Sequence, residues 1–584
     1  MSGFFAELKR RKVFKVGATY LVVAWLLIQV VATLAPQLQL PEWAPRLVTL
    51  ILLIGFPVAV VMAWMFDVTP GGVKRDPGDA VAVRVATSAA DTPTAALASS
   101  PAIPHKSIAV LPFADLSPTR DQEYFSDGIA EEILNALVKL KDLKVAGRTS
   151  SFSFKGRNED LRWIGRTLAV AHVLEGSVRK QGDKVRITAQ LIQTDDGFHL
   201  WSETYDGDLN DVFELQERIA RAITHELDVV LHGDQQHRLI PVATRNPEAY
   251  ALYLQASGIF NRREGTRFPE AIAQLEQALK LDPQFARAHA RLAAIHTIEP
   301  IYVPETTEAS LAAVEREATL AIALDPALAE PHAALAMMHA QRARLVDSQV
   351  SMERALAIDP DDLTANLWAG VMANSNGYTA KSCAYFDRVL AIDPLLPNAL
   401  LWRGIEYINS GDLQRGETLM LRAADVGLQH AGVGLHMAHA AHGQTDEAIA
   451  QLTGGLRGLG AGLPAEAPAL IAAAVYGDGA ARAAVLAMIE RTLATAEDGQ
   501  LRVIIPYTLL LLGEYQRALK LFRRKRTNNS PLFFFLLWSP AARTARALPE
   551  FVAFARENGM VELWDRYGAP DLCRKNAAGD YVCE

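Results

Sequence analysis

Acidic and histidine side chains can bind a metal ion, and this sequence brings them together in two places. His199, Glu203 and Asp206 lie close together in a segment with the pattern of a strand. Because alternate side chains of a strand point to opposite faces, a solvated face explains this group better than a metal site. The other group is His430, His436, His439 and His442. Only neighbouring members of the last three share a helical face, and no Cys or acidic residue is fixed beside them, so we predict no metal site.

Other patterns that could support chemistry are incomplete. The glycine-rich stretch from Gly454 to Gly462 lacks the preceding strand and the Lys-Ser/Thr pair of a phosphate-binding loop. The basic run from Arg523 to Arg526 is most simply a solvated helix end. The aromatic residues Phe533 to Phe535 and Trp538 fit a core better than a binding site. With no catalytic constellation in view, we predict that the protein is not an enzyme and holds no cofactor.

Two of the three cysteines lie close together near the end of the sequence. Cys573 and Cys583 are ten residues apart in a polar segment. They would form a disulfide in an oxidising compartment, or they are two free thiols that need no role. Both interpretations stay open on the sequence alone.

Composition places the chain among large, multidomain proteins. Its 584 residues exceed what one ordinary core accommodates, and half of them are hydrophobic. The net charge of -8, with no long basic face after the N-terminal segment, argues against nucleic acid as a partner.

The first 70 residues have the pattern of a membrane anchor. A basic cluster, Lys9 to Lys15, precedes an apolar run from about Val16 to Leu34, and a second run extends from Leu47 to Phe66. Each run is long enough to cross a bilayer, which favours two transmembrane helices over a cleaved signal peptide or a buried core helix. The basic flanks predict that both termini are cytoplasmic and that the lipid bilayer is a partner. A disulfide between the two C-terminal cysteines would contradict that topology.

The segment between the apolar runs and the first folded domain has no apolar periodicity. Residues 71–104 are rich in Ala, Ser, Thr, Pro and Asp, so we predict a flexible linker.

Strand and helix patterns alternate over residues 105–235. Ser107 to Phe113 is a short apolar run typical of a buried strand, and Ser126-Asp127 is a plausible N-cap of the helix that follows. The later strands and helices expected in this domain are Ala169 to Val178, Lys184 to Gln193, Phe198 to Tyr205, Asp160 to Leu168 and Asp211 to Leu231. These elements predict a small α/β domain.

This domain resembles a known bacterial family. The segments that carry the resemblance are SIAVLPFADLSPTRDQEYFSDGIAEEILNAL, RTSSFSFKG, AHVLEGSVRKQGDKVRITAQLI and GFHLWSETYDGDLNDVFELQERIARAI. They are similar to the TolB N-terminal-like (FlgO-related) domain, which in many proteobacterial proteins precedes tetratricopeptide repeats. The start, FFAELKRRKVFKVGATYLVVAWLLIQV, is similar to the membrane-anchored members. The resemblance implies a multi-pass protein of the bacterial inner membrane with its soluble region in the cytoplasm.

A repeat occupies residues 246–545. Asp-Pro pairs begin at Asp282, Asp325, Asp359 and Asp393, and the last three are 34 residues apart. A period of 34 built from two helices is that of the tetratricopeptide repeat, in which small residues such as Ala278 and Ala355 let paired helices approach. Residues 546–584 are expected to cap the last helices.

The predicted fold class is therefore multidomain: two transmembrane helices, a small α/β domain and an all-α tetratricopeptide solenoid. The predicted function is a membrane-anchored scaffold or signalling adaptor that binds protein partners through its repeats. The alternative is a nucleotide-responsive signalling protein or cyclase-associated regulator with a site in the α/β domain. The first helix of each repeat is expected to line the inner surface, and the candidate partner-binding residues there are His332, Asn366, Trp368, Asn398 and Arg403.

Overall fold

The computed structural model describes residues 66–69, 72–75, 103–119, 121–157, 159–231, 239–240, 242–262, 264–302, 306–428, 430–458, 464–495, 504–524 and 534–584. The chain divides into two compact units, Met1–Ser99 and Ser100–Glu584. In the first unit, β1 (Phe66–Thr69) and β2 (Gly72–Arg75) form an antiparallel hairpin in which Phe66 lies opposite Arg75.

The described helices contradict the predicted membrane anchor. None of them is long and apolar enough to cross a membrane, which takes about 20 apolar residues. The predicted transmembrane helices, the multi-pass inner-membrane location and the lipid bilayer as a partner are therefore corrected. The two apolar runs behind those predictions lie outside the described residues, apart from Phe66 in β1, and so does the predicted linker after Arg75 up to residue 102. The corrected fold class is a mostly helical repeat solenoid with a small α/β region.

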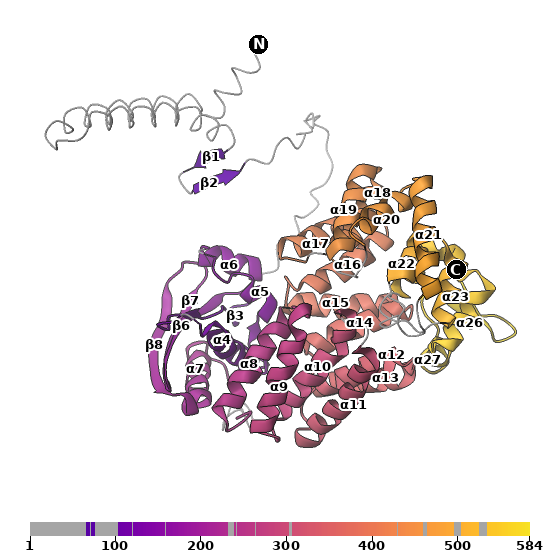
Figure 1. The fold of residues 1–584 in the computed structure, drawn as a ribbon. Helices are drawn as coiled ribbons and strands as arrows, with labels where there is room; N and C mark the ends of the chain where they lie inside the picture. The colour runs from indigo at the N-terminus through magenta and orange to yellow at the C-terminus, as the bar shows by residue number, and fades with distance from the viewer. Residues whose placement is uncertain are drawn as a thin grey trace, which may run out of the picture. The chain divides into compact units, whose positions relative to one another are not determined.

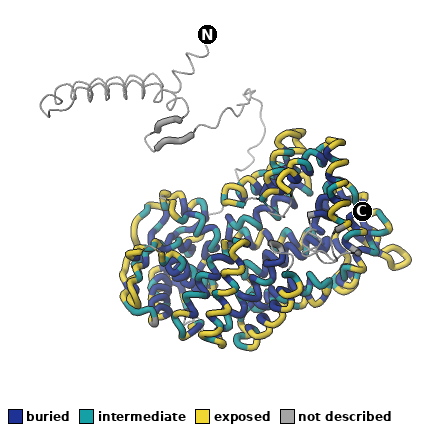
Figure 2. Tube along the Cα trace, viewed as in Figure 1, coloured by how far each residue is buried: buried dark blue, intermediate teal, exposed yellow. Residues whose placement is uncertain are grey.

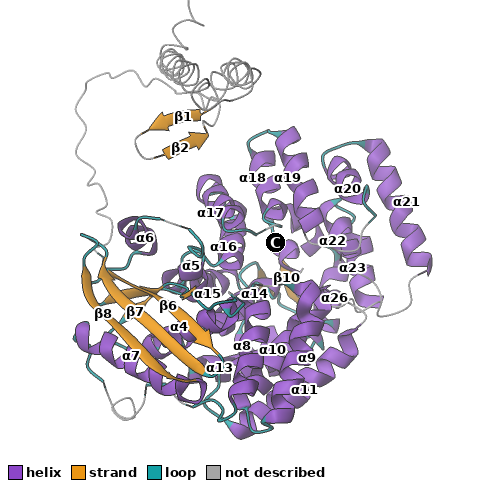
Figure 3. Ribbon diagram, turned by 60° about the vertical axis from the view of Figure 1, so that its left-hand side comes forward, coloured by secondary structure: helices purple, strands orange, loops and turns teal. Residues whose placement is uncertain are grey.

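The α/β region contains one mixed sheet in the order β5-β3-β6-β7-β8, with β4 paired to β6 (Figure 3). The strands are β3 (Ser107–Val110), β4 (Ala114–Asp115), β5 (Lys144–Val145), β6 (His172–Gln181), β7 (Lys184–Gln193) and β8 (His199–Asp208). Strand β3 is parallel to β5 and β6, whereas β6, β7 and β8 form an antiparallel meander with Val173 opposite Ile192 and Ile187 opposite Tyr205. The predicted strand at Ser107 and the three later strands are confirmed. Within the described residues, β8 pairs with β7 alone and so lies at an edge of the sheet.

Helices cover both faces of this sheet. They are α4 (Glu123–Val138), α5 (Arg148–Phe152), α6 (Leu161–Leu168) and α7 (Val212–Glu226), the last preceded by the 3-10 turn η1 (Leu209–Asp211). Because successive side chains of a strand alternate, Ile108 and Val110 pack with α4 and α7, whereas Ala109 packs with Ile164 of α6. Strand β3 is buried along its whole length for this reason.

The start of α4 differs from the predicted N-cap. The N-cap residue is Gln122, and Ser126 and Asp127 lie buried inside the helix. The carboxylate of Asp127 pairs with Lys155 at 2.5 Å, so its polarity serves a tertiary contact rather than the helix end.

The repeats are antiparallel helix pairs (Figure 1). The pairs are α8 (Pro247–Asn261) with α9 (Phe268–Leu281), α10 (Ala286–Tyr302) with α11 (Thr307–Leu324), α12 (Glu330–Gln341) with α13 (Leu345–Ile358), α14 (Leu363–Ser375) with α15 (Thr379–Ile392), α16 (Pro397–Asn409) with α17 (Leu413–Asp425), α18 (Gly432–Ala441) with α19 (Thr445–Gly458), α20 (Ala467–Val475) with α21 (Gly479–Thr495), and α22 (Ile504–Leu511) with α23 (Tyr515–Arg524). A 3-10 turn, η3 (Gly265–Arg267), joins α8 to α9. The predicted partner-binding residues lie on α12, α14 and α16, which are the first helices of their pairs.

The Asp-Pro pairs end the second helix of four repeats. Asp282, Asp325, Asp359 and Asp393 are the C-cap residues of α9, α11, α13 and α15, and their backbones are extended, with ψ between 82° and 98°. The residue before a proline disfavours the helical conformation, which explains why each helix ends there. The longer first interval is taken up partly by α10, which reaches Tyr302.

The end of the chain folds back onto the middle repeats. Its elements are η5 (Phe534–Trp538), η6 (Pro540–Ala542), α25 (Arg543–Arg546), α26 (Pro549–Glu557), α27 (Met560–Tyr567), β9 (Cys573–Lys575) and β10 (Tyr581–Cys583), which we call the C-terminal cap. The cap packs on α23 through α26, while η5 packs on α14 and α27 packs on α13. Figure 2 shows buried residues running through the repeats and into the cap.

Asp393 joins the α/β region to the repeats. Its carboxylate is fully buried and accepts hydrogen bonds from the backbone N–H groups of Thr149 and Ser150, at 2.9 and 2.8 Å, and from the Ser150 hydroxyl. These N–H groups belong to the first turn of α5, whose N-cap residue, Gly147, has no side chain to satisfy them. A carboxylate from the turn between α15 and α16 therefore caps a helix of the α/β region.

We expect Asp393→Ala to lower the free energy of unfolding by about 2 to 4 kcal/mol, because it leaves buried N–H groups without an acceptor. Asp359→Ala is the matched control: this residue holds the same place one repeat earlier and accepts a bond from the exposed N–H of Asp361 at 3.0 Å. That control should cost less than about 1 kcal/mol. Chemical denaturation of the full chain measures both, and equal losses would contradict the bridging role of Asp393.

Candidate protein-binding face of the repeats

The first helices of the repeats form one row. Contacts run from α8 to α10, and on through α12, α14 and α16 to α18, while each second helix packs against its own partner. We call the exposed side of this row the A-helix face. Stacked helix pairs use such a surface to bind other proteins. Another protein can bind only those parts of this face that the rest of the chain leaves uncovered.

Helix α4 of the α/β region covers the beginning of the A-helix face. A Cβ atom on Gly128 would come within 2.6 Å of the Leu254 side chain, so α4 and α8 approach closely because this residue is glycine. Phe213 of α7 packs on Tyr250 of α8, with ring centroids 4.6 Å apart. The buried apolar residues of α4, α7, α8 and α10 belong to one continuous core.

Buried ion pairs fix α4 on the repeats. Arg287 of α10 donates two hydrogen bonds to the buried carboxylate of Glu132, at 2.8 and 2.6 Å. The neighbouring Glu131 accepts bonds from Arg148 at 2.8 Å and from the side-chain amide of Asn261 at 3.0 Å. Paired and hydrogen-bonded in this way, the charges are tolerated away from water.

The pKa values of Glu131 and Arg287 reflect this pairing. Burial on its own would raise the pKa of Glu131, but the guanidinium groups of Arg148 and Arg291 hold it below its usual value. Burial likewise opposes the charge on Arg287, yet Glu132 raises the pKa of Arg287 well above its usual value. Both groups therefore stay charged at neutral pH, and α4 keeps one position on α10.

We expect Glu132→Ala to destabilise the fold by about 3 to 5 kcal/mol, because the charge of Arg287 then lies buried without a partner. Asp206→Ala removes one member of the exposed pair Arg186–Asp206 on the sheet, whose N–O distance is also 2.6 Å, and should cost at most about 1 kcal/mol. Urea unfolding of both variants measures the difference. A similar small loss in both would show that α4 is only loosely seated.

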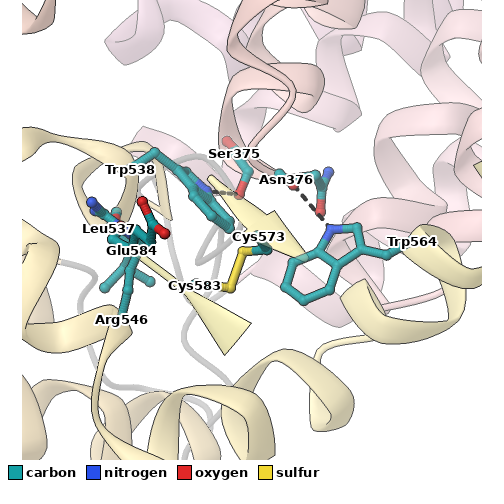
Figure 4. The surroundings of a disulfide bond; sticks show 9 residues. All are labelled: Ser375, Asn376, Leu537, Trp538, Arg546, Trp564, Cys573, Cys583 and Glu584. Atoms are coloured by element: carbon teal, nitrogen blue, oxygen red, sulfur yellow. Dashed lines mark hydrogen bonds between the residues drawn. A yellow bond between two sulfur atoms is a disulfide. The ribbon is translucent and has the colours of Figure 1, made fainter. Parts of the chain in front are cut away.

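The C-terminal cap covers the A-helix face at α14 (Figure 4). The indole N–H of Trp538 donates to the carbonyl of Ser375 at 2.9 Å, and that of Trp564 donates to the carbonyl of Asn376 at 3.1 Å. On the next first helix, Trp402 meets Phe535 edge to face, with centroids 4.8 Å apart. Two tryptophan side chains of the cap therefore donate hydrogen bonds to successive backbone carbonyls, those of Ser375 at the end of α14 and of Asn376 just after it.

A second set of hydrogen bonds completes this contact. The hydroxyl of Tyr378 donates to the carbonyl of Gly568 at 2.7 Å. Asp571 accepts a bond from the N–H of Ala380 at 2.8 Å, and its own N–H donates to the carbonyl of Gly377 at 3.0 Å. We call the contact of Trp538, Trp564, Gly568 and Asp571 with residues 375–380 the clasp.

Glu406 of α16 lies close to the clasp as a buried carboxyl group. It is 4% exposed, and burial raises its pKa to about 7, with a smaller contribution from Asp571 and opposing effects from Arg403 and Asn374. The folded state therefore holds the proton of Glu406 at pH values where the unfolded chain has released it.

This raised pKa predicts that stability falls with rising pH. The contribution from protonated Glu406 is present below the ordinary value of 4.5 and is lost as pH rises to about 7. We expect Glu406→Gln to raise the free energy of unfolding at pH 8 by roughly 1 to 3 kcal/mol relative to the parent, and not at pH 4. The exposed Glu447 provides the control variant Glu447→Gln. Parallel pH profiles for the parent and Glu406→Gln, measured by denaturation, would contradict this.

The structure separates the five predicted partner-binding residues into two groups. Asn366 and Trp368 are 1% and 5% exposed, and the Asn366 side-chain amide donates to the carbonyls of Pro360 and Asp362. They are part of the interior of α14. His332, Asn398 and Arg403 are partly exposed on α12 and α16.

Arg403 is the best-defined member of the exposed group. Its guanidinium lies 3.9 Å from the centroid of the Tyr407 ring and pairs with Asp387 at 2.7 Å. Its remaining contact is to the thiol of Cys383 at 3.4 Å. The side chain is thus fixed in place beside an aromatic ring.

Of the histidines considered above, His436 and His439 lie in α18, whereas His199 begins β8, His430 lies in a turn and His442 is the C-cap of α18. Nδ1 of His436 contacts the Tyr476 hydroxyl at 2.6 Å, and burial lowers the pKa of His436 to about 4, so the ring is neutral at pH 7. In the described part of the chain, no group of three or more metal-ligating side chains comes together. That the protein is not an enzyme and needs no cofactor stays a prediction.

Sequence reasoning missed the residues that occupy the A-helix face. The sequence pattern alone does not single out Glu131, Glu132 or Arg287 as contact residues. The available signal was the spacing of Arg287 and Arg291, which puts two guanidinium groups on one side of a first helix.

Two parts of the chain match family models. Residues 104–222 match the second domain of HilA/YgeH-like transcriptional regulators, and residues 263–297 match a TPR repeat. The predicted tetratricopeptide repeats are confirmed. The α/β region is similar to the HilA/YgeH-like domain, and the predicted relationship to TolB and FlgO is not supported.

Individual relatives resemble parts of the chain. A Rhizobium meliloti (strain 1021) protein named "Putative adenylate cyclase 3" is 40% identical over 208 residues, so the match spans 35% of each protein. The Pseudomonas aeruginosa pilF protein is 18% identical, with a TM-score of 0.28, and the match covers 35% of this chain and 88% of that one. A tetratricopeptide repeat protein from Parabacteroides merdae is 19% identical, with a TM-score of 0.28 and coverage of 42% and 98%. At such TM-scores, neither structure says anything about the partners of this chain.

Proposed function

We propose that this chain is a protein-interaction scaffold without catalytic activity, and that its partner binds the part of the A-helix face left open by α4 and by the C-terminal cap. The observation that supports this proposal is that α4 packs on α8 and bonds to α10, and the cap packs on α14 and on Trp402 of α16. In contrast, His332 of α12 and Arg403 and Tyr407 of α16 stay partly exposed. The match to the TPR repeat supports the class of role, because such repeats act by binding other proteins.

Arg403 and Tyr407 are the centre of the proposed surface. Binding energy at protein interfaces is concentrated in a few residues, among which Arg and Tyr are enriched. The ion pair with Asp387 already restricts the Arg403 side chain, so less conformational entropy is lost when a partner binds. His332 and Asn398 remain proposed contacts at the edge of this surface, whereas the burial of Asn366 and Trp368 makes direct contact from them unsuitable.

The test compares matched arginines on the two sides of the solenoid. Arg388 of α15 pairs with Asp361 at 2.9 Å, much as Arg403 pairs with Asp387, but it lies on a second helix. We expect Arg403→Ala combined with Tyr407→Ala to reduce partner retention at least about tenfold, because two anchor side chains are lost together. Arg388→Ala should leave retention unchanged.

The measurement is quantitative mass spectrometry of proteins cross-linked to the tagged full chain, with circular dichroism to verify helix content. If both variants retain the same proteins in the same amounts as the parent, the partner does not bind at α16.

A second candidate function is a regulator of nucleotide signalling with a site in the α/β region. The observation that favours it is the similarity to the Rhizobium meliloti protein named as an adenylate cyclase, over about a third of each chain. Incubation of the purified full chain with ATP and Mg²⁺ tests it. Formation of cyclic AMP above a heat-inactivated control would replace the scaffold proposal, whereas saturable ATP binding without turnover would favour the regulatory role.

A further inference from the structure

The clasp lies next to a small hairpin, β9–β10, whose two strands are joined by a disulfide. Cys573 and Cys583 lie opposite each other in β9 and β10 and are bonded to each other. This bond was one of the two interpretations left open by the sequence, and it argues against the predicted cytoplasmic topology, since disulfides persist in oxidising compartments. Asp571, which bonds to Gly377 and Ala380, is only two residues before Cys573.

The hairpin also supports both clasp tryptophans. Tyr581 of β10 packs edge to face on Trp564, with centroids 5.1 Å apart. The buried Arg546 donates to the carbonyl of Glu584, next to Cys583, at 2.5 Å, and to the carbonyls of Leu537 and Ser539 at 2.5 and 2.9 Å. Those two carbonyls flank Trp538. Figure 4 shows Trp538 and Trp564 on either side of the Cys573–Cys583 bond, with Arg546 beside Glu584.

We propose that the Cys573–Cys583 disulfide is a redox switch that keeps the clasp closed, and that its reduction frees residues 375–380 from the cap. A two-stranded ribbon of three-residue strands has little stability of its own, so the covalent bond adds a constraint to the contacts of Tyr581 and Lys575 with Asp565. Without the bond, the hairpin no longer positions Asp571, Tyr581 and the end of the chain against the clasp.

The chemical step is thiol–disulfide exchange with a dithiol reductant. One thiolate of the reductant attacks a cysteine sulfur and the S–S bond breaks. The second thiol of the reductant then closes the reductant's own disulfide, leaving two cysteine thiols. Two electrons and two protons pass from the dithiol to the protein. The sulfur atoms belong to residues only 9% and 5% exposed, but their neighbours Arg574, Lys575 and Val582 are exposed, so separation of the short strands gives the reductant access.

Opening the clasp would expose part of the A-helix face. Phe535 then loses its fixed position on Trp402 of α16, and the carbonyls at the end of α14 lose their indole donors. The switch therefore controls how much apolar surface the middle repeats present. This inference does not depend on which partner binds.

Hydrogen exchange of the full chain tests the switch. After treatment with dithiothreitol, we expect amides in residues 376–384 and 568–576 to exchange roughly tenfold faster or more, the change expected when two side-chain hydrogen bonds weaken. Residues 286–300, in α10, should be unchanged. The Cys583→Ser variant should show the same acceleration without reductant.

Cys383→Ser serves as the control, because Cys383 is the free cysteine and this variant should respond to dithiothreitol as the parent does. Unchanged exchange at 376–384 in the reduced protein would overturn the switch. So would faster exchange throughout α10 and the rest of the repeats, which would make the disulfide a requirement of the whole fold. Faster exchange that is confined to residues 376–384 and 568–576 supports the proposal.

Discussion

Buried charged side chains, each of which needs a partner of opposite charge, constrain the architecture of this protein. Glu131, Glu132, Arg287 and Arg291 lie between the sheet region and the first repeats, where each carboxylate needs a guanidinium nearby. A shift of α4 by one turn would leave these charges unpaired, at a cost comparable to much of the stability of an ordinary domain. The α/β region and the repeats consequently form one compact unit rather than two domains on a hinge. Asp393 of the repeats is likewise buried against the α/β region, where its carboxylate accepts hydrogen bonds from the start of α5.

The local elements of the fold followed from the sequence, whereas the long-range contacts did not. Alternation of apolar residues indicated β6, β7 and β8, and the Asp-Pro pairs marked the ends of four second helices. Nothing in the local pattern distinguishes Asp393, buried against α5, from Asp359 at the surface, because the difference lies in a segment 243 residues away. Trp368 was chosen as a surface residue for the same reason: its exposure depends on what packs over α14. The N-terminal apolar runs gave a membrane prediction that the described helices contradict.

The parts of the A-helix face that the rest of the chain covers determine where the proposed scaffold can bind a partner. A solenoid usually presents its whole inner surface, but here α4 occupies the start of that surface and the cap occupies α14. The proposed partner surface is therefore placed on the side chains of α12 and α16 that stay partly exposed, among them Arg403 beside Tyr407. Restriction of the open surface favours specificity, because fewer geometries of a partner fit.

The clasp has a consequence for how the chain folds. Each repeat contacts mainly its neighbours and can form as soon as it is synthesised, but the clasp joins residues separated by 163 to 194 positions. Contacts at such sequence separation form slowly. During synthesis the end of α14 and the ring of Trp402 stay uncovered until residues 535–571 have been made. In this interval the nascent chain exposes aromatic surface that the folded chain covers, and such transient exposure favours aggregation.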